Sequence, residues 1–122
     1  MSQKALVVDD SRIMRKIIRK VLASVGIDEV VEAADGNEGL QVFQSESPDL
    51  VLMDWNMPDR TGVELVRDIR AIDRATPLIM VTTEGEERRI CEAFDAGVSE
   101  YLVKPFDSKD LQRTLDLVMA SH

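Results

Sequence analysis

The chain has 122 residues, of which 44% are hydrophobic and 31% are charged, and its net charge is −8 at pH 7. This length fits one domain, residues 1–122, that can bury a hydrophobic core without disulfides or structural metals. The acidic balance argues against direct nucleic-acid binding, which needs a basic face, and the single cysteine, Cys91, excludes an internal disulfide framework.

Signals for targeting and for histidine chemistry are missing from the sequence. No apolar stretch approaches the ~20 residues of a membrane span, and the N-terminus carries no cleavable signal pattern. We therefore expect a cytoplasmic protein that does not insert into membranes. Cys91 is expected as a small residue on a helix. The only histidine, His122, is the last residue, which argues against a Ser-His-Asp triad or a metal–histidine site.

The first predicted elements are a strand and an amphipathic helix. Residues 4–8 form a short apolar run that predicts the strand. Ser11 can cap the helix that follows, and Gly26 ends it. Arginines and lysines take the other faces of this helix, and its apolar residues recur at helical spacing. These apolar residues are Ile13, Met14, Ile17, Ile18, Val21, Leu22 and Val25.

A second strand is expected at residues 30–33. Asp35 and Glu38, three positions apart, resemble a capping box and predict the start of a second helix. The region ends at Pro48. The apolar residues of this helix are Leu40, Val42 and Phe43.

A third strand is expected at residues 50–53, a run of four apolar residues that ends at Asp54. A loop through Pro58 leads to Thr61 and Glu64, which form a second capping-box pattern. The helix that follows is expected to bury three residues. They are Val63, Val66 and Ile69.

Pro77 precedes a fourth strand, expected at residues 78–81. Thr83 and Glu86 form a further T-x-x-E start, for a helix that ends near Gly97.

A fifth strand is expected at residues 101–103, and Asp107 can cap the last helix. That helix places Leu111, Leu115 and Val118 on one side. A βα unit is thus repeated five times, and strands without polar alternation are typical of a parallel sheet covered on both faces. We predict an α/β domain, a doubly wound (βα)5 fold with one five-stranded parallel sheet.

Polar residues follow the ends of the first, third, fourth and fifth strands, at the edge of the sheet where ligands bind in such folds. They are Asp9, Asp10, Asp54, Thr82 and Lys104. Two carboxylates ~4 Å apart repel each other by about 1 kcal/mol in water and about 4 kcal/mol at an effective dielectric of 20. Three carboxylates therefore need cations. Lys104 supplies one, and Mg²⁺ is the natural second because it binds carboxylates, waters and phosphate oxygens.

These residue types indicate phosphoryl transfer. With the metal present, Asp54 stays ionised and can attack a phosphoryl donor to form an acyl phosphate. Mg²⁺, Lys104 and the Thr82 hydroxyl can hold the phosphoryl oxygens. Taken singly, Asp9 and Asp10 fit a capping turn, Asp54 a solvated strand end, Thr82 a strand residue and Lys104 a surface lysine. Their joint placement at one sheet edge favours the site.

Four segments, VVDDS, DWNMPDRTG, VTTE and YLVKPF, occur in an order and at separations that resemble a response-regulator receiver domain. The resemblance covers essentially the whole chain and is strongest to single-domain regulators of chemotaxis. It implies the flavodoxin-like strand order 2-1-3-4-5 that is known for this family. It also implies that Asp54 is the phosphoacceptor and, with Asp9 and Asp10, part of a Mg²⁺ site in which Mn²⁺ can substitute. The backbone carbonyl of Asn56 would be a further ligand.

The resemblance implies a switch as well. Thr82 matches the switch hydroxyl, Tyr101 the switch aromatic and Lys104 the phosphate-binding lysine, whose bond to the following proline is cis in the family. Asn56 and Glu84 match positions that tune the approach of the water that removes the phosphoryl group. The implied partners are a sensor histidine kinase or phosphotransfer protein and a downstream protein. The downstream protein would contact the face formed by residues 86–96, 100–103 and 109–118.

Three further residues, Trp55, Met57 and Thr83, lie beside the predicted site in the sequence. Met57 is expected to pack the loop, and Trp55 is either a partly exposed platform or a local hydrophobic cover. Thr83 stands where the family commonly has a small residue. It either narrows access to Asp54 or serves only as a helix cap.

Two other functional classes fit the sequence less well. A phosphatase or phosphotransferase of the aspartyl-phosphate type usually has a second aspartate two residues after its nucleophile, where this chain has Asn56. A flavodoxin-like cofactor binder needs a hydroxyl- and glycine-rich loop after the first strand, where this chain has DDSR. We predict a signalling domain, not an enzyme, that catalyses its own phosphorylation and dephosphorylation. The chain is either complete and acts by binding other proteins, or a piece of a longer regulator.

Overall fold

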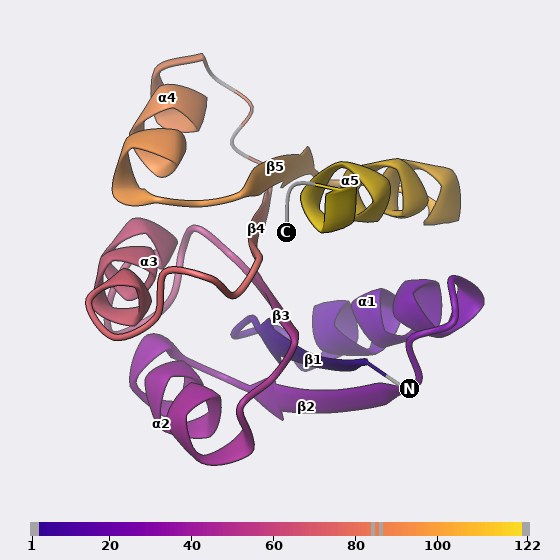
Figure 1. The fold of residues 1–122 in the computed structure, drawn as a ribbon, viewed down its shortest axis with the longest axis horizontal. Helices are drawn as coiled ribbons and strands as arrows, with labels where there is room; N and C mark the ends of the chain where they lie inside the picture. Colours follow the sequence, from indigo (N-terminus) through magenta and orange to yellow (C-terminus); the bar gives the residue numbers. More distant parts are fainter. Residues whose placement is uncertain (1–2, 84, 86, 121–122) are drawn as a thin grey trace.

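The computed structural model describes residues 3–83, 85 and 87–120, and in this part of the chain five strands alternate with five helices (Figure 1). The strands are β1 (Lys4–Val8), β2 (Glu29–Ala33), β3 (Leu50–Met53), β4 (Leu78–Thr82) and β5 (Glu100–Val103). The helices are α1 (Arg12–Ser24), α2 (Gly36–Glu46), α3 (Gly62–Arg70), α4 (Glu87–Ala96) and α5 (Ser108–Ala120). Every predicted element is present. His122, Glu84 and Glu86 lie outside the described residues.

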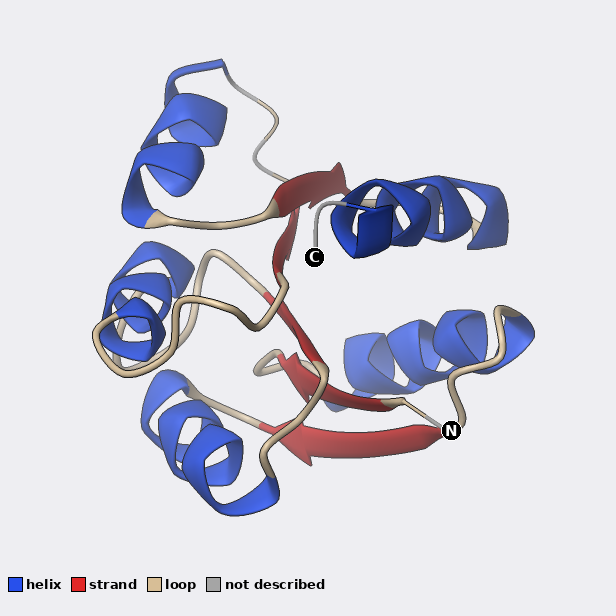
Figure 2. Cartoon of the chain, in the orientation of Figure 1, coloured by secondary structure: helices blue, strands red, loops and turns tan. Residues whose placement is uncertain are grey.

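All five strands run parallel in one sheet of order β2-β1-β3-β4-β5. This arrangement confirms the doubly wound fold and the implied strand order. Helices α1 and α5 cover one face of the sheet, and α2, α3 and α4 cover the other (Figures 1 and 2). Val8 pairs with Met53 and Thr82 pairs with Val103, so the residues after these strands emerge along one edge.

The sheet separates two hydrophobic clusters. Every residue of β3 and β4 is buried, which explains the absence of polar alternation in these runs. On the side of α2, α3 and α4 the cluster includes Val8, Met53 and Val66. On the side of α1 and α5 it includes Ile18 and Leu111. Full burial of one such aliphatic side chain stabilises the folded state by about 1.5–3 kcal/mol relative to leaving it exposed to water.

The apolar stripe of α1 is narrower than the sequence pattern indicates. Ile18 and Leu22 are buried, but Ile13 is 73% exposed and Ile17 is 46% exposed. Helix α1 packs against β1 and α5. Ile13 and Ile17, one turn apart, lie on a stripe beside that contact, so helical spacing alone did not distinguish the buried from the exposed apolar positions of this helix.

Most predicted helix caps are present. The Ser11 hydroxyl accepts a hydrogen bond from the backbone N–H of Met14 at 3.2 Å. Thr61 and Glu64 form a complete capping box. Asp107 accepts from the backbone N–H of Asp110 at 2.9 Å.

At α2 the predicted capping box is only half formed. Asp35 accepts from the Glu38 N–H at 2.8 Å, as expected, but the Glu38 carboxylate accepts from the Ala34 N–H at 2.6 Å instead of from Asp35. The start of α4 also differs from the prediction. This helix begins at Glu87, beyond Gly85, a residue of low helix propensity, so the exposed Thr83 is not its cap.

Among the described residues, no helix combines the length and the apolar character that crossing a membrane requires.

Candidate functional site

The carboxylates of Asp9, Asp10 and Asp54 meet at the carboxyl edge of the sheet, with ligand oxygens that all lie within 4.8 Å of one another. Each of the two strands involved is extended by one backbone hydrogen bond. The Asp9 N–H donates to the Ala33 carbonyl at 3.1 Å, and the Asp54 N–H donates to the Val8 carbonyl at 2.9 Å. These bonds fix the backbone at the edge, so the structure brings together the aspartates that the sequence pattern grouped.

Lys104 reaches this cluster from the end of β5. Its Nζ lies 3.0 Å from Asp9 Oδ2 and 3.6 Å from Asp54 Oδ1. The backbone N–H of Lys104 donates to the Thr82 carbonyl at 2.8 Å, and the Lys104-Pro105 peptide bond is cis, as the family resemblance implied. The side chain of Lys104 is largely buried, so its charge is weakly screened by solvent.

The three aspartates differ in their surroundings. Asp9 is buried, and its Oδ1 also accepts from the Ser11 N–H at 2.9 Å, whereas Asp10 is exposed. Burial raises the pKa of the Asp54 carboxyl above its usual value. The positive charge of Lys104 and the hydrogen bond from the Trp55 N–H lower this pKa. The negative charges of Asp9 and Asp10 raise it.

This donor set fits a hard divalent cation. Three carboxylates against one ammonium leave an excess of negative charge, and carboxylate oxygens are the ligands that Mg²⁺ prefers. The Asn56 carbonyl, two residues after Asp54, would be an additional oxygen donor. Asn56 pairs with Thr61 in an isolated antiparallel bridge. The described residues therefore hold an acidic cluster compatible with Mg²⁺.

Gly62 is a site residue that the sequence analysis missed. A side chain at this position would collide with the backbone carbonyl oxygen of Asp54, and its Cβ would lie 2.9 Å from the sulfur of Met80. Glycine thus allows α3 to begin directly beside the end of β3. The Gly62 N–H also donates to the Trp55 carbonyl at 2.6 Å, which closes the loop between β3 and α3. The only sequence signal is the Thr61-Gly62 pair at the helix start.

Trp55 is a hydrophobic cover, the second of its two predicted roles. Its side chain is 4% exposed and belongs to the cluster on the α2, α3 and α4 side. The Arg89 guanidinium, from α4, lies 5.0 Å from the centroid of the indole ring, within the range of a cation–π interaction. Met57 is partly buried against the same cluster, as expected for loop packing.

The two predicted switch residues lie on neighbouring strands. Thr82 is buried at the end of β4. Tyr101 pairs with Met80 in the sheet and packs, partly buried, against the cluster that contains Trp55. Glu84, the remaining predicted tuning residue, lies outside the described residues.

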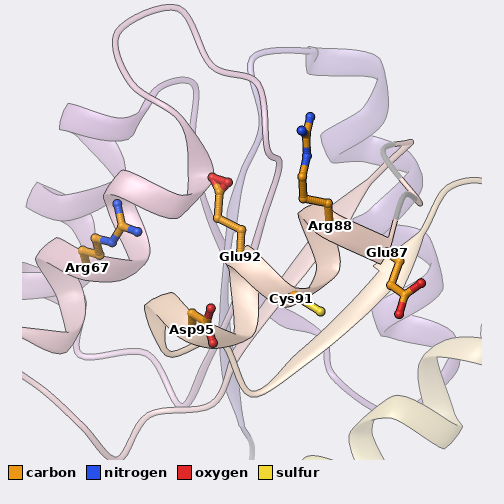
Figure 3. A pocket seen from close by; sticks show the side chains of 6 residues that line it. All are labelled: Arg67, Glu87, Arg88, Cys91, Glu92 and Asp95. Atoms are coloured by element: carbon orange, nitrogen blue, oxygen red, sulfur yellow. The ribbon is translucent and has the colours of Figure 1, made fainter.

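An open cavity of about 620 Å³ lies between α3 and α4. Its lining is mostly charged and contains none of the predicted catalytic, metal-binding or switch residues (Figure 3). The lining residues are Arg67, Glu87, Arg88, Cys91, Glu92 and Asp95. Cys91 is exposed on α4, which confirms its predicted place on a helix.

Comparisons with protein families, with individual proteins and with solved structures all find proteins of one kind. A family described as the response regulator receiver domain matches residues 5–116. The chain is 41% identical over 122 residues to the chemotaxis protein CheY1 of Helicobacter pylori, covering 98% of both chains. It is 42% identical over 121 residues to the chemotaxis protein CheY homolog of Campylobacter jejuni, covering 97% of this chain and 93% of that one. The solved structure of the chemotaxis response regulator CheY4 of Vibrio cholerae superimposes with a TM-score of 0.88 at 38% identity, covering 97% of this chain and 99% of that one.

Proposed function

The chain belongs to the response regulator receiver domain family, and on this premise we propose that residues 1–122 form one receiver domain that is phosphorylated on Asp54. The phosphoryl group comes from a sensor histidine kinase or a phosphotransfer protein in a Mg²⁺-dependent reaction. The single observation that carries this proposal is the convergence of three carboxylates and Lys104 at one sheet edge. The names of the relatives support chemotaxis as the pathway.

Asp54 is the nucleophile in the proposed reaction. One of its carboxylate oxygens forms a bond to phosphorus while the bond from phosphorus to the donor nitrogen breaks, and the donor imidazole keeps the electron pair. Lys104 lies close enough to Asp54 to bind a phosphoryl oxygen on the incoming group. The Thr82 hydroxyl donates a hydrogen bond to another oxygen.

Mg²⁺, or Mn²⁺ as a substitute, would be held by Asp9, Asp10, Asp54 and the Asn56 carbonyl, and when bound it neutralises carboxylate and phosphoryl charge. Asp9 also holds Lys104 in place through their 3.0 Å contact. The chain's own part is therefore to keep a nucleophile and a cation side by side at a partly desolvated edge.

The phosphatase alternative is not favoured. An aspartyl-phosphate phosphatase needs a general acid near its nucleophile, and the Asn56 amide cannot donate a proton as a carboxylic acid does. We propose instead a signalling domain whose only reactions are its own phosphorylation and its own dephosphorylation. In the second reaction, Asn56 and Glu84 control the approach of water to the phosphoryl group.

The output partner is proposed to be a protein that binds the face made by α4, β5 and α5. Each of these elements exposes an apolar side chain: Phe94 is 43% exposed, Val103 is 42% exposed and Leu117 is 55% exposed. Exposed apolar residues on adjacent elements favour a protein partner. The net charge of −8 argues against nucleic acid, and a cytoplasmic location follows from the proposed kinase partner.

The test is phosphorylation in solution. The protein is incubated with a small phosphodonor and Mg²⁺, and one phosphoryl group is expected by intact-mass measurement. Asp54→Asn should abolish the mass gain, whereas Asp116→Asn, an exposed aspartate on α5, should leave it unchanged. The proposal is wrong if Asp54→Asn gains the same mass, or if the reaction runs at full rate in excess EDTA.

A further inference from the structure

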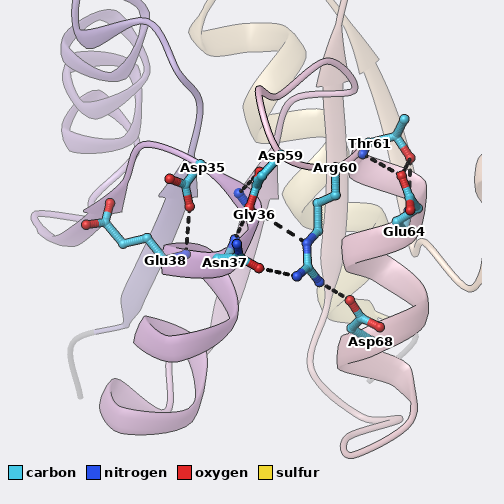
Figure 4. Close-up of polar contacts among 9 residues, drawn as sticks. All are labelled: Asp35, Gly36, Asn37, Glu38, Asp59, Arg60, Thr61, Glu64 and Asp68. Atoms are coloured by element: carbon cyan, nitrogen blue, oxygen red, sulfur yellow. Dashed lines mark hydrogen bonds and ion pairs between the residues drawn. The ribbon is translucent and has the colours of Figure 1, made fainter.

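The loop between β3 and α3 is bound at its tip to the N-terminus of α2. The Asp59 carboxylate accepts two backbone hydrogen bonds there, from the Gly36 N–H at 2.9 Å and from the Asn37 N–H at 2.7 Å (Figure 4). These are amides of the first turn of α2, which lack partners within the helix. Asp59 therefore acts as a second cap of α2, supplied by a different segment of the chain.

Arg60 strengthens the same connection. Its guanidinium pairs with Asp68 on α3 and donates to the side-chain carbonyl of Asn37 on α2 (Figure 4). Its aliphatic part lies directly over Gly36, where an added Cβ would collide with Arg60 Cγ and lie 2.5 Å from Cδ. Glycine at this position is what allows the arginine to cross from the loop to both helices.

The other end of the loop is also closed. Asn56 pairs with Thr61 in the antiparallel bridge, and the Gly62 N–H donates to the Trp55 carbonyl. Asp59 lies in the chain between the bridged residues Asn56 and Thr61, so its bonds to α2 anchor the same short loop that carries Asn56. The carbonyl of Asn56 is the proposed metal ligand, so the contact at the tip bears on the site.

We infer that Asp59 is a positioning residue for the metal site: by binding the N-terminus of α2 it holds in place the loop that carries the Asn56 carbonyl, the proposed additional metal ligand. This inference rests on the proposed function. The ionised form of Asp59 is the one the contact needs. Partial desolvation acts to raise the pKa of Asp59, but the Gly36 and Asn37 N–H donors outweigh it and hold the pKa below its usual value.

The chain offers a matched control for this role. Asp35 caps the same helix by accepting from the Glu38 N–H at 2.8 Å, but it does not belong to the loop between β3 and α3. Removal of either aspartate destabilises α2. Only the removal of Asp59 also releases from α2 the tip of the loop that carries Asn56.

The experiment compares Asp59→Ala with Asp35→Ala in the full chain. Mg²⁺ is titrated into each protein, the dissociation constant is measured from Trp55 fluorescence and from backbone amide NMR shifts, and stability is measured by urea denaturation. Both variants should lose stability. Only Asp59→Ala should bind Mg²⁺ more weakly, by about tenfold, as expected when an outer support of a metal ligand is lost. Asp59→Asn, which keeps one acceptor oxygen, should fall between wild type and Asp59→Ala, and it replaces Asp59→Ala if that variant does not fold.

Two outcomes overturn the inference while leaving the proposed function in place. In the first, the wild type binds Mg²⁺ and the Asp59 variants bind it equally well. In the second, Asp35→Ala weakens Mg²⁺ binding as much as Asp59→Ala, which would make the effect one of general stability. If the wild type itself shows no Mg²⁺ binding, the proposed function fails first.

Discussion

The ammonium group of Lys104 lies 3.6 Å from Oδ1 of Asp54 and is the only cation within 4 Å of that carboxylate among the described ion pairs. The same ammonium lies closer, at 3.0 Å, to Oδ2 of the buried Asp9. Lys104 thus partly neutralises two carboxylates that Mg²⁺ would also bind. Lys104 and Mg²⁺ would thus both balance the charge of these carboxylates. Because Lys104 is not one of the proposed metal ligands, its substitution leaves the ligand set unchanged.

Lys104→Met should therefore slow phosphorylation of Asp54 without weakening Mg²⁺ binding. Loss of a cation that stabilises the transferring phosphoryl group should lower the phosphorylation rate by a factor on the order of 10²–10³. The Mg²⁺ dissociation constant should not rise, because a competing cation has been removed. Rates with a small phosphodonor and Mg²⁺ titrations of the same sample make the comparison. Lys109→Met, at an exposed position on α5, is the control. A large loss of Mg²⁺ affinity in Lys104→Met would contradict the assigned role.

Asp54 should destabilise the metal-free protein near neutral pH. Its folded-state pKa is raised above the ordinary value of 3.8, chiefly by burial, so ionisation is less favourable in the folded chain than in the unfolded chain. The contribution of Asp54 to the free energy of unfolding is fully favourable at pH values below 3.8 and is lost as the pH rises through the folded-state pKa. Asp54→Asn should thus raise the free energy of unfolding near neutral pH, and the gain should vanish in acid.

Urea denaturation in EDTA over a range of pH measures this effect, with Asp116→Asn as the control. Saturation with Mg²⁺ at about 100 times its dissociation constant should stabilise the wild type by about 2.7 kcal/mol, and Asp54→Asn by less. A pH-independent difference between wild type and Asp54→Asn would show that packing, not ionisation, is responsible.

The acidic cluster at the sheet edge could be predicted from the sequence because the residues that define it follow directly after apolar strand segments. The apolar run that ends at Asp54 sets the strand boundary, and a parallel sheet then brings Asp9 and Lys104 to the same edge without further information. The role of Asp59 in positioning the loop between β3 and α3 could not be predicted from the sequence. It depends on two amides 22 and 23 residues away and on an irregular loop with no periodicity to interpret.

The exposure of Ile13 shows a second limit of pattern reasoning. Helical spacing indicates which residues share a face, but the width of the buried stripe depends on the neighbours of the helix. Helix α1 packs against β1 and α5, which leaves room for a stripe centred on Ile18 and Leu22. For Trp55 the sequence allowed two environments, and the position of α4 with Arg89 decided between them.

Arg89 should stabilise the protein through the indole ring of Trp55. Arg89→Ala removes a cation 5.0 Å from the ring centroid, and the expected loss is about 0.5–1 kcal/mol in the free energy of unfolding, together with a change in Trp55 emission. Arg88→Ala changes the neighbouring exposed arginine, which lines the cavity between α3 and α4, and serves as the control. Equal effects in the two variants would rule out a specific contact with Trp55.

Asn56 and Glu84 should set the lifetime of the phosphoryl group. Asn56 is exposed, so a longer basic side chain can be accommodated at that position without disturbing the core. Asn56→Arg and Glu84→Lys should change the rate of self-dephosphorylation by a factor on the order of ten to a hundred, because they alter how water is positioned for attack. The rate is followed as loss of phosphoryl mass after removal of the donor. Unchanged decay in both variants would mean that these positions do not control the water.

Phosphorylation should move Tyr101 and the face made by α4, β5 and α5. A phosphoryl group adds negative charge and strong acceptor oxygens at Asp54, and the buried Thr82 hydroxyl can gain a charge-assisted hydrogen bond by moving toward them. We expect that movement to vacate space beneath the loop after β4. Tyr101, partly buried on the neighbouring strand, has an amphipathic ring suited to either a buried or an exposed position.

We expect the outward position of Tyr101 to be favoured without phosphate and the inward position with it. Switching should be partial, because a ligand shifts such an equilibrium only by its differential affinity for the two states. Amide and side-chain NMR spectra with and without beryllofluoride, a phosphoryl mimic, make the measurement, and Thr82→Ala should uncouple Tyr101 from the occupied site. If Tyr101 and the residues of α4, β5 and α5 do not respond while Asp54 is occupied, the signal leaves the domain by another surface and the proposed partner face is wrong.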